Sequence, residues 1–557
     1  MKRLILFLFL PLTVVSQEFD FGIVWGGQQS DNASRIVVDN SGDLICSGTY
    51  TGTSEFPGGT LAGFGFQDVF ITKTSSDGNP IWQIGIGGSN TDQSSAIAVD
   101  ANGDVYVSGR FQGSIDLDPS SAIQSLNSSP PGSLDGFLAK YSGADGSLLN
   151  YWDITSGGVM DIRSIAIDEN GDIFLAGQFS QTVDFNFGVG TSSLTSFLNS
   201  GDGFVARYSS AMNLAWVNPV ASNTPAIDYL SDVKLSPDGS LYVTGLLGGT
   251  ADVDPGVGQT NLVGAIDALL VRYAKNTGAL LWGFVLGGNS IDLGVALHVT
   301  EEMDIVITGS LNSSSMDVDP GPNSVLLAKT GNSSAPFIAR YSSDKTFINA
   351  SVYLGSADLN ATVTKLIPGL GSTIIAIGSF NGSIDIDLGD GVETLVSDST
   401  DSFVAQFTAD FSLDRFIHIG GAGDQILNDA AAFGTNLYGS VQINGNCRPN
   451  MPSNVSVGLV SSGYDAAILA WNLMPVVLTT DISASQDVKA FPNPCINSFS
   501  LEGLSTEASI SLINMQGQRW NIQANAAQFD VSALALGFYI VEISQNGNLS
   551  YSKLIKN

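Results

Sequence analysis

Pairs of acidic side chains two residues apart recur along the chain, and each pair could offer carboxylate oxygens to a hard cation. They are Asp116 and Asp118, Asp252 and Asp254, Asp317 and Asp319, and Asp385 and Asp387, with Asp184 and Asn186 as a fifth, mixed pair. Residues two apart in an extended segment face the same way, and calcium prefers oxygen ligands. The stretch DIDLGDGVE, which adds Asp390, is the best single candidate for a calcium site.

The competing interpretation of these pairs is structural. A short Asp side chain can accept a nearby backbone N–H and cap a turn, and the Pro-Gly in DVDPG favours a turn. Because five copies recur at one register, we favour turn capping, with calcium as the alternative. Catalysis by these pairs is disfavoured, since a glycosidase uses one asymmetric pair in one pocket.

Other catalytic groups are scarce in this sequence. Neither His298 nor His418 has a Cys, His or carboxylate cluster at ligand spacing, which argues against a zinc site or a catalytic triad. The stretch SSDGNPIW approaches the boxes of sialidase-like propellers, but its Gly stands one place early. Such enzymes also need an arginine cluster, and basic residues are few. We therefore expect no enzyme.

The elements that carry these residues form a repeat. A pattern of Asp, any residue, Phe, aliphatic, any residue, basic, aromatic starts at Asp68, Asp135, Asp202, Asp267, Ala335, Asp401 and Asp465. The starts are 67, 67, 65, 68, 66 and 64 residues apart. Each unit holds four runs with strand-like alternation, which in the second unit are 95–100, 104–111, 136–142 and 148–155. Four antiparallel strands in each of seven units predict an all-β, seven-bladed β-propeller.

A further Asp follows a Gly-Gly-like turn in each unit. These residues are Asp31, Asp92, Asp161, Asp228, Asp292, Asp358 and Asp424. One copy per unit at one position predicts a carboxylate that accepts backbone N–H bonds in the loop between blades.

The two ends of the repeat array complement each other. Residues 19–27 match a fourth strand that has no partner before it, and residues 464–472 match a third strand whose fourth is missing. We therefore predict that 19–25 pair with 465–471, which would close the ring and remove exposed sheet edges.

Charge and the N-terminal residues constrain location and partners. The chain has 21 basic and 53 acidic residues, a net charge of −32, which disfavours nucleic acid and anionic membranes as partners. Residues 1–16 combine a charged start with a short apolar run and predict a cleaved signal peptide. No other apolar run approaches the roughly 20 residues of a membrane-spanning helix.

The repeat over 17–473 resembles the bacterial SBBP β-propeller repeats, on the pattern Trp, Gly-Gly, Asp, then AIAVD-x-NGDVYVSG. That resemblance implies the propeller fold and says little about activity. A linker is predicted over 474–487, and residues 488–557 read as a small Ig-like β-sandwich.

The residues of 488–557 are similar to the C-terminal sorting domain of the type IX secretion system. The match rests on Pro492, Asn493, Pro494, Gly517, Asp530, Gly537, Tyr539 and Lys553, which occur in the family's order. The resemblance implies export across the outer membrane of a Gram-negative bacterium by the type IX machinery. The cargo would be secreted or kept on the cell surface, attached to lipopolysaccharide after the tag is removed.

The function expected from the sequence is a secreted or cell-surface scaffold for binding or adhesion, with an extracellular glycan or protein as ligand. Long connections such as 112–134 and 312–334 are the expected contact surfaces. The alternative is an extracellular hydrolase of polysaccharide or protein that contains calcium. Carboxylates converging in one pocket beside Arg or aromatic side chains would favour that alternative.

Overall fold

The computed structural model describes residues 18–129, 131–154, 159–256, 258–329, 334–357, 359–449, 459–473, 489–491, 497–502, 509–514, 519–522, 529–532, 534, 537–545 and 548–556. The predicted signal peptide (1–16) and linker (474–487) lie outside these residues. Contacts divide the chain into a large unit, Phe19–Asn472, and a smaller one that includes the residues from Leu473 onward. No helix in the described part is long and apolar enough to cross a membrane.

The large unit begins with five separate four-stranded antiparallel sheets. The first two contain β2 (Asn32–Val38), β3 (Leu44–Tyr50), β6 (Asp68–Thr74) and β7 (Pro80–Ile86), then β8 (Asp92–Val99), β9 (Val105–Gln112), β12 (Leu134–Tyr141) and β13 (Leu148–Asp153). The third contains β14 (Met160–Ile167), β15 (Ile173–Phe179), β18 (Asp202–Tyr208) and β19 (Leu214–Val220). The fourth and fifth contain β20 (Tyr229–Leu235), β21 (Ser240–Leu247), β24 (Asp267–Ala274) and β25 (Leu280–Leu286), then β26 (Leu293–Val299), β27 (Ile305–Leu311), β30 (Ala335–Tyr341) and β31 (Phe347–Val352).

A ten-stranded sheet follows, and it joins two further four-strand sets end to end. The first set is β33 (Asn360–Pro368), β34 (Ile374–Asn381), β37 (Asp401–Phe407) and β38 (Leu413–Ala422). The second is β39 (Gln425–Phe433), β40 (Asn436–Pro449), β41 (Leu459–Asn472) and the N-terminal β1 (Glu18–Gly27), with β4 (Thr53–Phe56) and β5 (Gly59–Ala62) beyond β1. Pairing of β38 with β40 links the two sets.

Short ribbons fill the connections between the second and third strands of these sheets. They are β10 (Ser114–Asp116) with β11 (Ser125–Asn127), β16 (Thr182–Asp184) with β17 (Ser193–Thr195), β22 (Thr250–Asp252) with β23 (Asn261–Val263), β28 (Ser315–Asp317) with β29 (Leu326–Ala328), and β35 (Ser383–Asp385) with β36 (Thr394–Val396) and β32 (Leu354–Gly355). One 3-10 turn, Phe197–Asn199, is the helical element in the described part.

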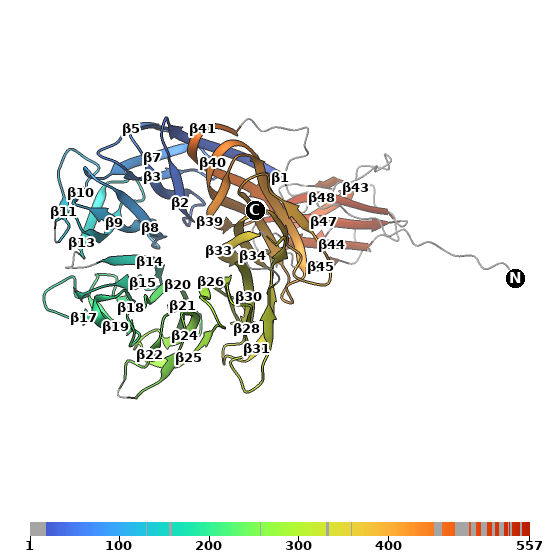
Figure 1. Cartoon of the computed structure of the whole chain (residues 1–557). Helices are drawn as coiled ribbons and strands as arrows, with labels where there is room; N and C mark the ends of the chain where they lie inside the picture. Colours follow the sequence, from blue (N-terminus) through green and yellow to red (C-terminus); the bar gives the residue numbers. More distant parts are fainter. Residues whose placement is uncertain are drawn as a thin grey trace. The chain divides into compact units, whose positions relative to one another are not determined.

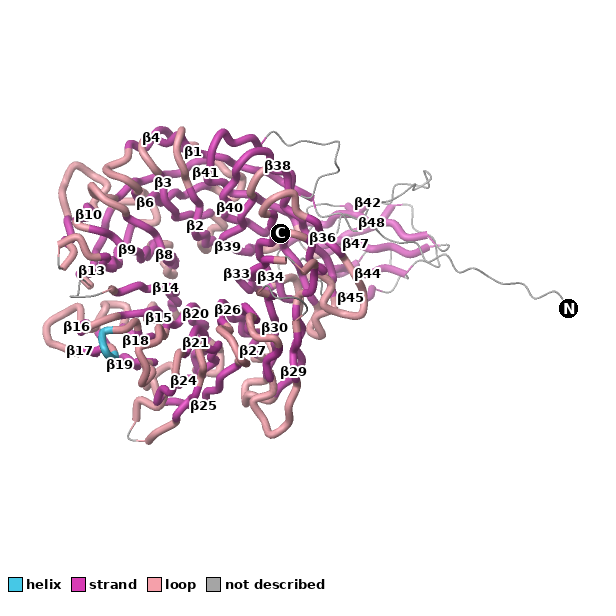
Figure 2. Tube along the Cα trace, viewed as in Figure 1, coloured by secondary structure: helices cyan, strands magenta, loops and turns pink. Residues whose placement is uncertain are grey.

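The first strands of successive sheets are neighbours. Strand β2 contacts β8, β8 contacts β14, and the contacts continue through β20, β26, β33 and β39 back to β2. The sheets surround an opening in this unit (Figures 1 and 2). The fold is thus all-β and propeller-like, with apolar cores between adjacent sheets, such as the cluster of Ile71 and Ile86 with Val107 and Phe137.

The N-terminal strand lies where the ends of the repeat predicted it. Strand β1 is the hydrogen-bonded neighbour of β41. The Phe19 and Trp471 rings meet edge-on at 6.4 Å between centroids, and the backbone N–H of Asp31 donates to the carbonyl of Tyr464 at 2.7 Å. The N-terminal strand and the last strands of the large unit therefore share one sheet.

Each first strand contains an irregularity that its sequence does not reveal. The register with the second strand shifts between Ala33 and Arg35, between Ser94 and Ala96, and between Ile162 and Ser164. The same shift recurs in β20, β26, β33 and β39. At such a bulge two residues of one strand lie opposite a single residue of its partner, and the directions of their side chains change.

The C-terminal unit contains two small antiparallel sheets. One holds β42 (Lys489–Phe491), β43 (Ser498–Glu502) and β46 (Phe529–Asp530), and the other holds β44 (Ser509–Asn514), β45 (Arg519–Ile522), β47 (Gly537–Gln545) and β48 (Asn548–Lys556). Their shared core includes Phe499, Leu512, Val541 and Leu554.

Candidate functional site

The aspartate pairs lie on separate ribbons and cap turns there. Asp116 Oδ1 accepts the backbone N–H of Asp118 at 3.1 Å and that of Gln124 at 2.9 Å. Asp252, Asp317 and Asp385 do the same with residues two and eight positions further on. The second residue of each pair, Asp118, Asp254, Asp319 or Asp387, accepts one more backbone N–H.

The aspartate pairs lie on separate ribbons and do not converge on one site. Asp390 is exposed on its ribbon. Within the described ranges, no three His, Cys, Asp or Glu side chains are grouped so that they could hold a metal ion. The hydrogen bonds support the turn-capping interpretation, and calcium at the pairs stays a prediction.

Within the described residues, five of the seven aspartates after the Gly-Gly turns accept a backbone N–H bond. Asp31, Asp92, Asp228 and Asp292 bind the N–H groups of Gly27, Gly88, Gly248 and Gly288, respectively, and Asp424 binds that of Thr400. Asp358 lies outside the described residues. Asp161 accepts hydrogen bonds from the Ser95 hydroxyl and Arg163 Nε, and residues 155–158 before it lie outside the described residues.

Relative to Asp92, Asp161 is shifted by one residue along its strand. Met160 occupies in β14 the register position that Asp92 has in β8, since each lies opposite a Phe of the second strand. Side chains alternate along a strand, so one step turns a residue to the other side. Asp161 therefore faces the opening of the large unit.

A cavity of about 550 Å³ lies at that opening. Its lining comes from β2, β8, β14, β20, β26, β33 and β39, together with Arg110 at the end of β9. Most of these residues stand at or beside the bulges, among them Ser95, Arg163, Asp232 and Lys365. The bulges thus build the cavity surface.

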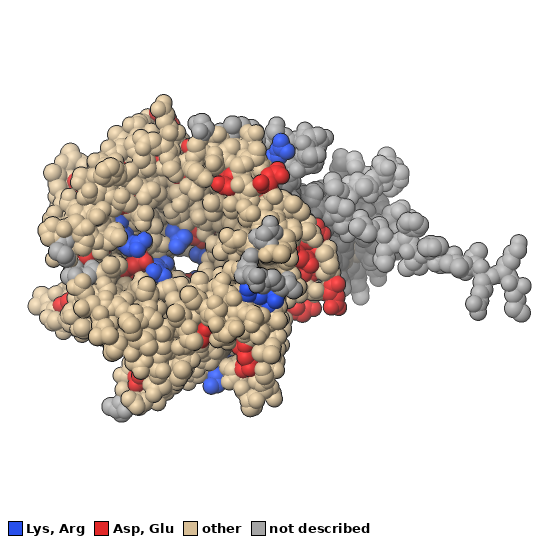
Figure 3. All heavy atoms as spheres, viewed as in Figure 1, with Lys and Arg blue, Asp and Glu red and all other residues tan. Residues whose placement is uncertain are grey.

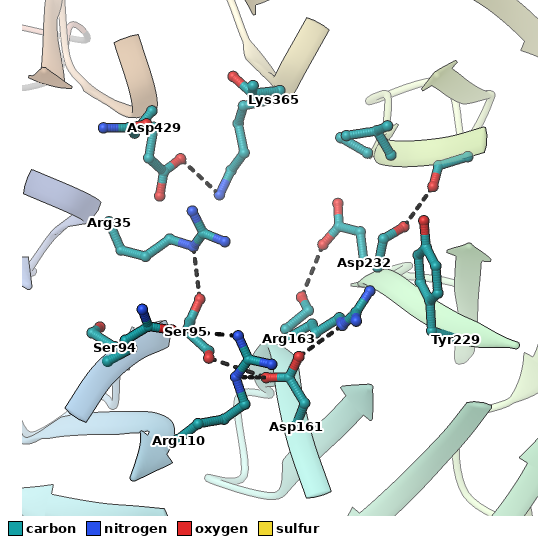
Figure 4. A pocket seen from close by; sticks show the side chains of 18 residues that line it. Arg35, Ser94, Ser95, Arg110, Asp161, Arg163, Tyr229, Asp232, Lys365 and Asp429 are labelled. Carbon is teal, nitrogen blue, oxygen red and sulfur yellow. Dashed lines mark hydrogen bonds and ion pairs between the residues drawn. The ribbon is translucent and has the colours of Figure 1, made fainter. Parts of the chain in front are cut away.

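Four cationic side chains reach into this cavity from different sheets (Figure 4). Arg35 donates from Nε to the Ser95 carbonyl at 2.8 Å and from Nη1 to the Ser34 carbonyl at 3.0 Å. The guanidinium carbon of Arg163 lies 4.1 Å from the centre of the Tyr229 ring, in the range of a cation–π contact. Arg110 and Lys365 complete the set.

Three carboxylates share the cavity, and each is already engaged. Arg163 Nε lies 2.9 Å from Asp161 Oδ2, and Lys365 Nζ lies 3.0 Å from Asp429 Oδ1. Lys234 Nζ lies 2.7 Å from Asp232 Oδ1. Burial alone would raise the pKa of Asp232, but the ammonium groups of Lys234 and Lys365 and several hydrogen bonds hold it below its ordinary value. Asp232 is therefore ionised at neutral pH.

The lining carries a local positive balance in an acidic protein. Four cations against three carboxylates give +1, whereas the whole chain has −32. Figure 3 shows blue Lys and Arg atoms around the opening. The expectation that basic residues are too few for an arginine cluster is wrong, because Arg35, Arg110 and Arg163 line one cavity.

The sequence did hold a signal for this site. Arg35, Arg163 and Lys365 each interrupt an otherwise apolar or small-residue first strand, in ASRIVVD, DIRSIAID and TVTKLIPG. A charge within such a run predicts a polar surface on the inner strand. Alternation alone does not predict which side of the sheet the charged side chain is on, because the bulge shifts the side-chain directions by one residue.

The described residues include four of the eight residues on which the similarity to the sorting domain rests. Gly537 opens β47, Tyr539 is buried next to Trp520, Asp530 ends β46, and Lys553 pairs with Ile540. Pro492, Asn493, Pro494 and Gly517 lie outside the described residues.

Comparison with known proteins identifies one segment. Residues 489–557 match the family described as a secretion system C-terminal sorting domain. This match indicates export by the type IX secretion system, to the cell surface or the surrounding medium. The machinery of that system is thus one partner of the chain.

Similarity elsewhere is distant. An uncharacterised WD repeat-containing protein of Acanthamoeba polyphaga mimivirus is 26% identical over 276 residues, which are 42% of this chain and 20% of the viral protein. The chain spans about a fifth of that relative.

Two solved structures are similar at low identity. A quinohemoprotein alcohol dehydrogenase of Pseudomonas putida is 10% identical with a TM-score of 0.38, covering 86% of this chain and 79% of the enzyme. A protein of unknown function from Dyadobacter fermentans is 10% identical with a TM-score of 0.36, covering 82% and 99%.

Proposed function

We propose that the protein is an exported, closed seven-bladed propeller that binds extracellular polysaccharide in its central cavity. The observation that carries this proposal is the cavity of about 550 Å³, to which the first strand of every sheet contributes. A concave site with a few convergent polar groups is the usual form of a ligand site. The sorting domain accounts for delivery to the compartment where polysaccharide occurs.

The chemistry of the lining supports a carbohydrate rather than an apolar ligand. The aliphatic contribution to the lining is limited to Val295 and Ala296. Hydroxyl and amide side chains prevail, namely Gln93, Ser94, Ser95, Ser164, Tyr229, Ser231, Thr364 and Asn428. Such groups exchange hydrogen bonds with sugar hydroxyls. The outer ribbons in 112–134 and 312–334, expected as contact surfaces from the sequence, stay a secondary prediction.

A glycan array with the full exported chain tests this proposal. We expect binding that is lost when Val295→Trp fills the cavity and kept when Val189→Trp is made on an exposed ribbon position. Both variants add the same bulk, and their melting curves check the fold. Equal binding by the Val295→Trp variant, or no binding to any glycan, would overturn the proposal.

Three carboxylates converge beside Arg and Tyr side chains in the cavity, which is the arrangement expected of the hydrolase alternative, but their protonation and pairing oppose it. A glycosidase needs one carboxylic acid that is protonated before it reacts, and the lowered pKa of Asp232 opposes that role. Asp161 and Asp429 are held in ion pairs. We therefore expect no release of reducing ends from polysaccharide. Release that disappears in Asp161→Asn would replace the binding proposal with the hydrolase.

A further inference from the structure

Arg35 is the cation of the cavity that has no carboxylate to neutralise it. In the described part of the chain Arg35 forms no ion pair with a carboxylate, and its two hydrogen bonds go to backbone carbonyls. These bonds use Nε and Nη1 and fix the guanidinium at the cavity (Figure 4). Nη2 has no partner among the described residues, so it is available to a ligand.

The neighbouring charges make this position suited to one anionic group. Lys365 points toward Arg35 and is paired with Asp429, whereas Arg163 lies further away and is paired with Asp161 (Figure 4). The lining holds four cations against three carboxylates, and Lys234 from outside the lining pairs with one of these, Asp232, so at least one positive charge is in surplus. A half-buried guanidinium whose remaining N–H groups point into a cavity pairs well with the two oxygens of a carboxylate.

We propose, resting on the function proposed above, that Arg35 anchors the carboxylate of a singly charged acidic sugar residue in this cavity. Hydroxyl and amide groups of Ser94, Ser231, Thr364 and Asn428 would take the sugar hydroxyls. The field of a protein with net charge −32 repels dense polyanions. This repulsion favours one isolated uronate among neutral sugars over sulfated or fully acidic polymers.

Calorimetric titration of the full exported chain tests the anchor. The ligands are glucuronosyl-xylose, its carboxyl-reduced glucosyl-xylose form, and a monosulfated disaccharide. We expect glucuronosyl-xylose to bind at least about tenfold more tightly than the reduced form, because hydrogen bonds to charged groups contribute about 1.5–3 kcal/mol. Arg35→Ala should remove this preference, and Arg35→Lys should keep part of it, since Lys supplies the charge without the planar fork.

Arg448→Ala serves as the matched control, because it removes one positive charge at an exposed position of β40 outside the cavity. It should leave the titration unchanged. Equal binding of the neutral and uronate forms, tighter binding of the sulfated sugar, or an unaffected Arg35→Ala variant would overturn the inference and leave a glycan scaffold standing. Absence of every glycan ligand on the array would overturn the proposed function itself.

Discussion

Asp92 is a fully buried carboxyl group that has a second carboxylate near it. Burial raises its pKa to about 7, and the charge of Asp68 adds to the increase, whereas the N–H of Gly88, at 2.7 Å, opposes it. The same combination of burial and a neighbouring carboxylate, Asp228, raises the pKa of Asp202 to about 6. Asp68 and Asp202 lie on third strands, and Asp92 and Asp228 lie at or just before the first strand of the following sheet.

A pH prediction follows from these raised values. Between the ordinary pKa of Asp and the raised one, the folded state binds more protons than the unfolded chain, so stability falls as pH rises through that window. We expect the melting temperature to increase by ~2–4 °C on acidification from pH 7.5 to pH 5. Below pH 4 the ion-paired carboxylates with lowered pKa, such as Asp39 and Asp168, should protonate and reverse the trend.

Substitution of Asp92 isolates its share of this effect. Asp92→Asn removes the buried charge and should raise the melting temperature at pH 8 while flattening the slope between pH 5 and 8. Asp145→Asn, at an exposed turn, should leave that slope unchanged. A variant of Asp92 with the full pH dependence would show that this carboxyl is not the group that titrates.

At the scale of elements, the ribbons between second and third strands depend on one Asp each. In the ribbon of β22 and β23, Asp252 Oδ1 joins the N–H groups of Asp254 and Thr260, at 3.1 and 2.9 Å. We expect Asp252→Asn to keep the ribbon, because an amide oxygen accepts the same bonds. Asp252→Ala should lose them and cost about 1–2 kcal/mol, read from chemical denaturation.

Removal of divalent cations separates the two interpretations of these pairs. With turn capping alone, EDTA should leave the melting temperature unchanged. A decrease with EDTA that calcium reverses, together with loss of that response in Asp252→Asn, would instead support calcium at the ribbons.

The elements show which features the sequence could predict. Strand order in each unit, the pairing of 19–25 with 465–471 and the turn-capping aspartates follow from spacing and alternation. The cavity lining could not be predicted in this way, because a bulge in each first strand places two residues where alternation assigns one. The shifted register of Asp161 is visible in the sequence, since it stands seven residues before Asp168, whereas Asp92 stands eight before Asp100.

At the scale of the large unit, β1 covers a sheet edge that would otherwise be open. Deletion of residues 18–24 should expose β41, and an exposed edge recruits other chains. We expect the shortened protein to elute as dimers or larger species in size-exclusion chromatography with light scattering. Adding a peptide of residues 18–27 in excess should restore the monomer. A monomeric, equally stable deletion variant would contradict the role of β1 in closure.

The bulges assign core packing and cavity lining to different residues of the same first strand. In the first strands, apolar residues such as Ile36 and Ile162 are buried in the cores between sheets, whereas residues at the bulges, such as Arg35 and Arg163, line the cavity. Substitutions at Ser95, Val295 or Thr364 can therefore alter which molecule is held without disturbing what keeps the sheets together. If the proposed binding function holds, such a scaffold lets the ligand change during evolution with little effect on folding.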